Sequence, residues 1–85
     1  MNIETSLNYL KITGVDADKF LQGQLTCDIY EANESLPLLG AHCNVKGRIE
    51  SLFEIFKKNK NYFLLMPSTI IEHAHTTLKK YRKSA

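Results

Sequence analysis

Tryptophan is absent from this sequence, and cysteine and proline each occur only twice in 85 residues. The two cysteines, Cys27 and Cys43, are sixteen positions apart and belong to no Cys-x-x-Cys motif, which excludes the disulfide framework of a small secreted domain. The N-terminus, residues 1–4, has neither the basic and apolar regions of a secretory signal nor the arginine-rich start of a transit peptide. We therefore expect a cytoplasmic protein with reduced cysteines.

Long apolar runs and a strong excess of one charge are also missing. No run approaches the roughly 20 apolar residues of a membrane-spanning helix. The net charge of +2 is too small to indicate a nucleic-acid-binding protein, and the basic cluster at 79–83 is routine for the C-terminal end of a helix. With 44% hydrophobic and 24% charged residues, the sequence predicts one soluble globular domain over residues 1–85. It predicts no membrane partner, and RNA binding through the basic cluster stays a less favoured alternative.

Apolar residues alternate in four stretches, which we interpret as strands over 7–13, 38–44, 48–57 and 62–66. The last of these is apolar throughout, so we expect it to be central or covered on both faces. In the third, Ile49, Ser51, Phe53 and Ile55 are expected on one face and Glu50 on the other.

Helical spacing of apolar residues predicts a short helix over 17–25 and a second helix that starts after Pro67. The order is therefore β-α-β-β-β-α, which predicts an α+β fold with a mainly antiparallel sheet and two helices on one face, of the ferredoxin-like kind. Such a fold usually ends with one more strand after the second helix, and this sequence has none there.

The histidines and cysteines do not predict a metal site. His73 and His75 are two positions apart on a helix and point roughly 200° apart, and His42 and Cys43 are neighbours on a strand and face opposite ways. We expect no metal in this segment.

Catalytic groups are not predicted either. Cys43 diverges from His42 for the same reason, and Asp28 beside Cys27 raises the pKa of that thiol instead of lowering it. We therefore assign no catalytic residue.

The predicted hairpin between the second and third strands gathers an amide, two cations, a flexible glycine and a carboxylate: Asn44, Lys46, Gly47, Arg48 and Glu50. Such a group is able to hydrogen-bond a polar heterocycle and attract an anionic tail. A plain hairpin with charged ends explains the same residues equally well.

Two segments together resemble the YgfZ/GcvT-like folate-binding family. Residues 12–28 are similar to its opening signature of a strand, Gly-x-Asp and then Phe/Tyr-Leu-Gln-Gly-Gln-hydrophobic-Thr-x-Asp, and residues 39–49 are similar to its strand, Asn/Asp and Lys-Gly segment. The resemblance covers residues 12–81, and two linked motifs make it more specific than either alone. The signature residues are Phe20, Leu21, Gln22, Gly23, Gln24, Thr26 and Asp28.

The resemblance implies a protein that binds tetrahydrofolate or a related folate and is related to the aminomethyltransferase of the glycine cleavage system. The YgfZ branch supports the maintenance of iron–sulfur cluster enzymes, including tRNA-modifying ones, which implies iron–sulfur client enzymes as partners. Combined with the hairpin, the family pattern implies the following folate-binding candidates: Leu7, Tyr9, Asn44, Lys46, Gly47 and Glu50.

Departures from the family pattern favour a non-enzymatic protein over an enzyme. Residues 47–51, Gly-Arg-Ile-Glu-Ser, stand where the transferase branch has Gly-Gly-hydrophobic-Asp-Asp, so only the Glu50 carboxylate is left, and the downstream cysteine signature of the YgfZ branch is absent. Family members are several times longer and continue into another strand. We therefore predict that the chain is the N-terminal lobe of a longer protein, half of a GcvT-type domain without its closing strand.

Two alternatives stay open from the residues alone. One is a protein-interaction module that pairs through an exposed sheet edge, including with a second copy of itself, and the other is an aminomethyltransferase-related enzyme. Within the signature, we expect Gly23 to let helix and sheet approach closely. For Gln22 and Gln24 we weigh structural hydrogen bonds against ligand contact.

Overall fold

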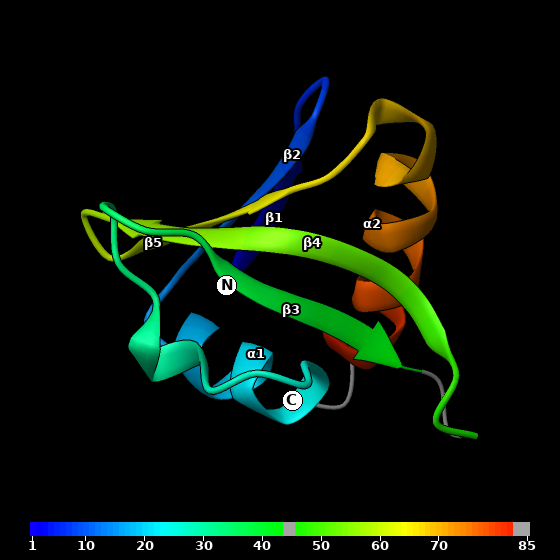
Figure 1. Ribbon diagram of the computed structural model, residues 1–85, viewed down its shortest axis with the longest axis horizontal. Helices are drawn as coiled ribbons and strands as arrows, with labels where there is room; N and C mark the ends of the chain where they lie inside the picture. Colours follow the sequence, from blue (N-terminus) through cyan, green and yellow to red (C-terminus); the bar gives the residue numbers. More distant parts are fainter. Residues whose placement is uncertain (44–45, 83–85) are drawn as a thin grey trace.

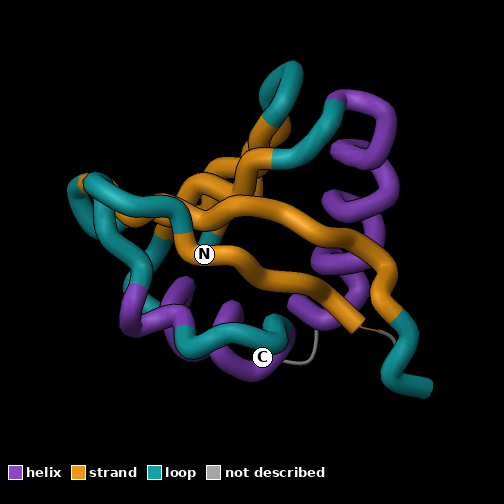
Figure 2. The backbone as a smooth tube through the Cα atoms, in the orientation of Figure 1, coloured by secondary structure: helices purple, strands orange, loops and turns teal. Residues whose placement is uncertain are grey.

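A computed structural model shows a single twisted sheet with two helices packed on it (Figure 1, Figure 2). The structure describes residues 1–43 and 46–82, except for the side chains of residues 81 and 82. Its elements in chain order are β1 (Asn2–Thr5), β2 (Tyr9–Thr13), α1 (Ala17–Gln24), the 3-10 helix η1 (Ile29–Glu31), β3 (Leu38–Cys43), β4 (Ile49–Lys58), β5 (Asn61–Leu65) and α2 (Ser68–Arg82).

The described strands form one five-stranded sheet in the order β1-β2-β5-β4-β3, and each neighbouring pair is antiparallel. Both helices contribute to the same hydrophobic core, so both cover one face of the sheet. Leu21 of α1 and Leu78 of α2 are fully buried there together with Leu10, Ile55 and Leu64 of the strands. The opposite face has no helix over it in the described part of the chain.

These observations confirm the α+β class, the antiparallel sheet and the two helices on one face. The expected strands and helices lie within two residues of the observed ones, and the apolar strand β5 is central, as expected. Asn59 and Lys60 both have positive φ and close the β4–β5 hairpin as a two-residue turn.

The N-terminal strand β1 corrects the predicted order. Its four residues pair with β2, from Asn2↔Thr13 to Thr5↔Leu10. The chain therefore runs β-β-α before the three-strand meander, and β1 lies at the sheet edge beside β2. A split βαβ unit places one strand between the two it connects. Here two strands, β5 and β4, lie between β2 and β3.

The segment after α1 ties the helix layer to the outer edge of β3. Thr26 donates its backbone N–H to the Ala41 carbonyl at 3.0 Å, and its Oγ1 accepts from the Ala41 N–H at 3.1 Å. Leu25 also forms a bridge with His42. Thr26 thus satisfies two edge groups of β3 that would otherwise need water or another strand.

Two other signature residues hold the loop that follows. The Gln22 Oε1 accepts from the Ile29 N–H at 2.8 Å, and the Asp28 Oδ1 accepts from the Tyr30 N–H at 3.1 Å, which caps η1. Leu21 is in the core and Phe20 packs against it. Gln24 makes no side-chain hydrogen bond within the described residues. The signature is therefore largely a device that builds the α1–η1–β3 connection.

Gly40, and not Gly23, is the glycine that permits close packing. A Cβ on Gly40 would lie 2.8 Å from Cys27 Sγ and 2.9 Å from Ile55 Cδ1, distances that packed atoms do not adopt. A Cβ on Gly23 would have no heavy atom within 4 Å. The expectation that Gly23 lets helix and sheet approach is therefore wrong.

Gly40→Ala should lower the free energy of unfolding by about 1–3 kcal/mol, because the new methyl overpacks the contact between Cys27 and Ile55. Urea denaturation of both proteins measures the difference. In the Cys27→Ala background the loss should be smaller, because the sulfur atom is gone.

The matched control is Gly23→Ala, which adds the same methyl in open space. It should raise stability by up to about 1 kcal/mol through better helix propensity. Equal effects of the two substitutions would contradict the assignment of close packing to Gly40.

Candidate functional site

The hairpin candidates lie at the connection between β3 and β4. Lys46 and Gly47 are exposed, and Gly47 has a φ of +80°, in agreement with the flexible glycine that the hairpin motif predicts. Asn44 lies outside the described residues. Lys46 and Gly47 are therefore accessible to a ligand from solvent.

Glu50 does not point with its neighbours as strict alternation predicts. The ladder changes register between His42 and Cys43, so that His42 pairs with Ser51 and Cys43 with Ile49, and Glu50 is the extra residue of a β-bulge. Ile49, expected in the core, is 64% exposed. Glu50 turns instead to the helix side of the sheet.

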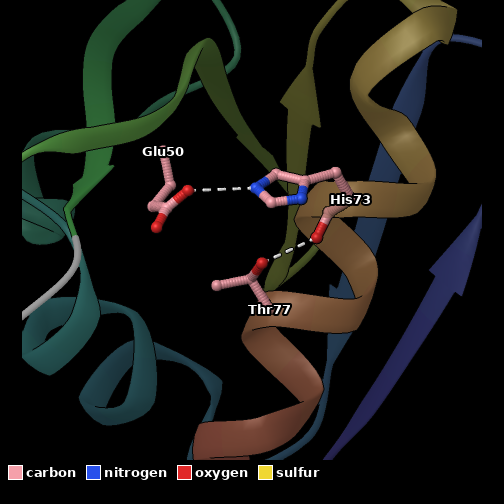
Figure 3. Close-up of polar contacts among 3 residues, drawn as sticks. All are labelled: Glu50, His73 and Thr77. Atoms are coloured by element: carbon pink, nitrogen blue, oxygen red, sulfur yellow. Dashed lines mark hydrogen bonds and ion pairs between the residues drawn. The ribbon is translucent and has the colours of Figure 1, made fainter.

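On that side Glu50 contacts helix α2. Its Oε2 lies 3.2 Å from Nε2 of His73 (Figure 3). The Thr77 hydroxyl donates to the His73 carbonyl at 2.8 Å, one turn further along the helix. The one carboxylate of the hairpin is therefore engaged with α2, and a ligand at the Lys46–Gly47 turn would have to compete for it.

Next to this pair the cross-strand residues His42 and Ser51 are both buried, each at 2% exposure. Burial lowers the pKa of His42; the Glu50 carboxylate opposes this shift and His73 adds to it. The Ser51 Oγ has no hydrogen-bond partner among the described residues. Because the two side chains are enclosed, no substrate reaches them, and we assign them no catalytic role.

Leu7 and Tyr9 lie elsewhere. Leu7 is 82% exposed in the β1–β2 turn, and Tyr9 projects from β2 onto the sheet face that carries no helix, where its ring contacts Phe63 edge to face at a centroid distance of 5.6 Å. Figure 1 shows the β1–β2 turn and the end of the β3–β4 hairpin well apart in the view. Among the described candidates, Leu7 and Tyr9 therefore lie apart from the Lys46–Gly47 turn and Glu50, and the structure does not bring these five residues into one site.

That open face holds residues that sequence reasoning did not select. Two shallow grooves of about 440 and 450 Å³ share Leu65. Tyr9 lines the first, whereas Lys46, Gly47 and Glu50 line neither. The signal was present in the strands, because Phe56 and Phe63 fall on the face opposite the buried Ile55 and Leu64. The residues that complete the first groove are Glu34, Phe56, Lys58, Phe63 and Leu65.

The cysteines do not form a reactive centre. Burial raises the pKa of the Cys27 thiol, a backbone hydrogen bond opposes this, and the carboxylates of Asp28 and Glu31 raise it further. Asp28 thus acts in the expected direction, although burial is the larger cause. No three His, Cys, Asp or Glu side chains within residues 1–43 and 46–82 are placed to hold a metal ion.

The stability of the fold should fall as the pH is lowered from about 7.5 to about 5.5. The pKa of His42 is lower in the folded protein than its ordinary value of about 6.5, so the unfolded chain binds the proton more tightly. The stabilisation is therefore present above about pH 6.5 and is lost as the pH falls towards the folded value. Urea midpoints across this range measure the change.

His42→Leu should flatten this dependence, whereas His73→Gln, which keeps a hydrogen-bonding group opposite Glu50, should retain most of it. An unchanged slope in His42→Leu would show that another group titrates.

No protein-family model matches the chain, but comparisons with known proteins identify relatives. The chain is 39% identical over 72 residues to the tRNA-modifying protein YgfZ of Colwellia psychrerythraea and, equally, to that of Vibrio atlanticus, in each case over 85% of the chain. It is also 36% identical over 78 residues, 91% of the chain, to an uncharacterized protein of Haemophilus influenzae.

These matches cover only part of each relative, 22% of both YgfZ proteins and 28% of the Haemophilus protein. Within the part of the chain that the structure describes, no helix is long and apolar enough to span a membrane. The identity over most of the chain confirms the resemblance that the two motifs indicated. Over the matched residues, the chain is therefore similar to part of the YgfZ proteins.

Proposed function

We propose that the chain is the N-terminal part of a YgfZ-type folate-binding protein that supports the maintenance of iron–sulfur enzymes and, through them, tRNA modification. The observation that carries the proposal is the 39% identity to two proteins named tRNA-modifying protein YgfZ. The two linked motifs, the Gln-Gly-Gln helix and the Lys-Gly hairpin, support the folate-binding part of the proposal, because they resemble the motifs of the folate-binding family. The α+β half of a GcvT-type domain is the corresponding fold.

A tetrahydrofolate or related folate is the proposed cofactor. Only some of the six folate-binding candidates are placed where they could contact the same folate molecule. Lys46 and Gly47 are exposed and can receive an anionic group, but Glu50 is held by His73. Tyr9 lines a groove on the other face. The residues therefore do not surround one ligand, and the hairpin alone does not fit a whole folate.

The geometry favours a binding role over catalysis in this segment. The single hairpin carboxylate points to α2, and Ser51, the neighbouring hydroxyl, is buried. Neither group is placed to act on a cofactor at the hairpin surface.

Titration with 5-formyltetrahydrofolate tests the proposed function on the longer protein of which this chain would be a part. We expect saturable binding with a Kd below about 1 mM, and weaker binding by the 85-residue chain, because one wall of a pocket would come from elsewhere. Lys46→Gln should weaken binding if the hairpin holds the anionic tail, while Lys79→Gln, the same change on α2, should not. Absence of binding at millimolar ligand would exclude the folate function.

A second candidate, a module that pairs through a sheet edge, keeps one supporting observation. β1 is a short edge strand whose outer side faces no described strand, whereas the β3 edge is partly covered by Thr26. In this case the chain should self-associate through β1.

Sedimentation velocity over about a hundredfold range of concentration measures this self-association. A sedimentation coefficient that rises with concentration supports edge pairing. Thr5→Pro in β1 should abolish the rise, because the Thr5 N–H points away from β2 and is lost as a donor at the open edge. A monomer at every concentration excludes this candidate.

A further inference from the structure

The groove on the open face that is lined by Tyr9, Phe56, Phe63, Leu65, Glu34 and Lys58 has the composition of a small-molecule site. We call it the aromatic groove. The groove is shallow and open to solvent, with a volume of about 440 Å³. Its apolar residues are half-buried although they lie on the face away from the core.

Three rings from three neighbouring strands form the floor of the aromatic groove. Phe56 of β4 is directly opposite Phe63 of the central strand β5, and Tyr9 of β2 contacts Phe63 edge to face. Rings presented side by side on an open sheet are a platform on which planar heterocycles stack. Stacking of this kind adds to the affinity without selecting one heterocycle.

Two opposite charges stand at the rim of the aromatic groove, Glu34 and Lys58. Within the described residues neither forms an ion pair, with each other or with another side chain. A ligand with hydrogen-bond donors and an anionic group would therefore match this rim: its donors would face the Glu34 carboxylate and its anionic group the Lys58 ammonium.

The loop that carries Glu34 is braced. The Asn33 carbonyl accepts from the Lys57 N–H of β4 at 3.1 Å, and its side-chain Oδ1 accepts from the N–H groups of Ser35 and Leu36 at 2.8 and 3.0 Å. Glu34 is thus presented from a backbone tied to the same strand that supplies Phe56 and Lys58. Such preorganisation reduces the entropy lost on binding.

We propose that the aromatic groove binds an amino-substituted planar nitrogen heterocycle that carries an anionic group. The ring stacks on Phe56 and Phe63, its N–H groups donate to the Glu34 carboxylate, and the anionic group pairs with Lys58. The pterin and glutamate of a folate have this chemistry, and so do the guanine and phosphate of a guanine nucleotide. The folate case rests on the proposed function; the nucleotide case does not.

The second groove extends the aromatic groove past Leu65. It is lined by Asn8, Leu39, Leu52, Glu54 and Pro67 among others, and most of this lining is apolar. An elongated ligand such as a folate therefore has room to continue across the sheet, from the Lys58 end of β4 toward its β3–β4 end.

Chemical-shift mapping on the 85-residue chain, at ligand concentrations up to the millimolar range, locates even a weakly bound ligand. Proton–nitrogen spectra are recorded with 5-formyltetrahydrofolate, with guanosine monophosphate and with uridine monophosphate, whose base lacks the amino group. We expect the first two to shift the amides of Glu34, Phe56, Lys58 and Phe63, and the third to do so several times more weakly.

Each outcome separates this inference from the proposed function. Shifts with the folate confined to the Lys46–Gly47 turn would overturn the aromatic groove and leave folate binding intact. Shifts at the groove with the guanine nucleotide alone would uphold the groove and contradict a folate as its ligand, while the titration of the longer protein still decides the proposed function. Equal shifts with all three ligands would overturn the role of Glu34, and no shifts with any ligand would overturn the site.

Charge-neutral variants test the two contacts without disturbing the core. Glu34→Gln and Lys58→Gln should each weaken binding about two- to fivefold, as expected for contacts of exposed charged side chains. Glu72→Gln and Lys79→Gln make the same changes on the exposed surface of α2 and should leave binding unchanged. Phe63→Leu should weaken binding about tenfold or more, because the stacking contact is lost. The unfolding midpoint of this variant is measured in parallel to show that it is still folded. Wild-type affinity in both rim variants would contradict the proposal.

Discussion

The two hydrogen bonds between Thr26 and Ala41 are the constraint on which the arrangement of the layers depends. They join the end of α1 to the outer edge of β3, so the helix layer and the sheet are held together at an edge as well as through the core. Gly40, directly before Ala41, leaves the space that Cys27 fills. Because the Ala41 N–H and C=O are satisfied, this part of the β3 edge is a poor template for another strand.

Because both helices lie on one face, the other face of the sheet is left uncovered in the described part of the chain, with polar residues, the exposed Leu39 and Leu52, and a band of half-buried rings. A sheet of five strands with a helix layer on one side is stable. The rings on the other face are not buried in the core, so core packing does not explain why they lie together. Tyr9, Phe56 and Phe63 come from three strands that meet only in the folded sheet. The open face is therefore the surface on which this segment can recognise something outside itself.

The alternation of apolar residues was sufficient to predict most of the fold, since it reports directly which side chains face the core. It failed where the backbone departs from regularity. In β1 only Ile3 is buried, so the strand shows no alternation of apolar residues that could predict it. It is recognised as a strand only from its backbone pairing with β2. The bulge at Glu50 shifts the alternation by one residue, and no residue pattern in the sequence predicts it. As a result, Ile49 and Glu50 lie on the faces opposite to those expected. The open-face rings were visible as alternate positions, but only the sheet order brings them together.

The family signature and the functional surface are therefore different parts of the molecule. Gln22, Thr26 and Asp28 are occupied with backbone groups of the α1–η1–β3 connection, so a relative that keeps them keeps the fold without necessarily keeping a ligand. Gly23 has no such structural role, because it is exposed and a side chain there would touch nothing. The residues that identify the family thus explain how this segment is built. What it binds depends instead on side chains that project from the middle of the strands, on the face that the signature leaves uncovered.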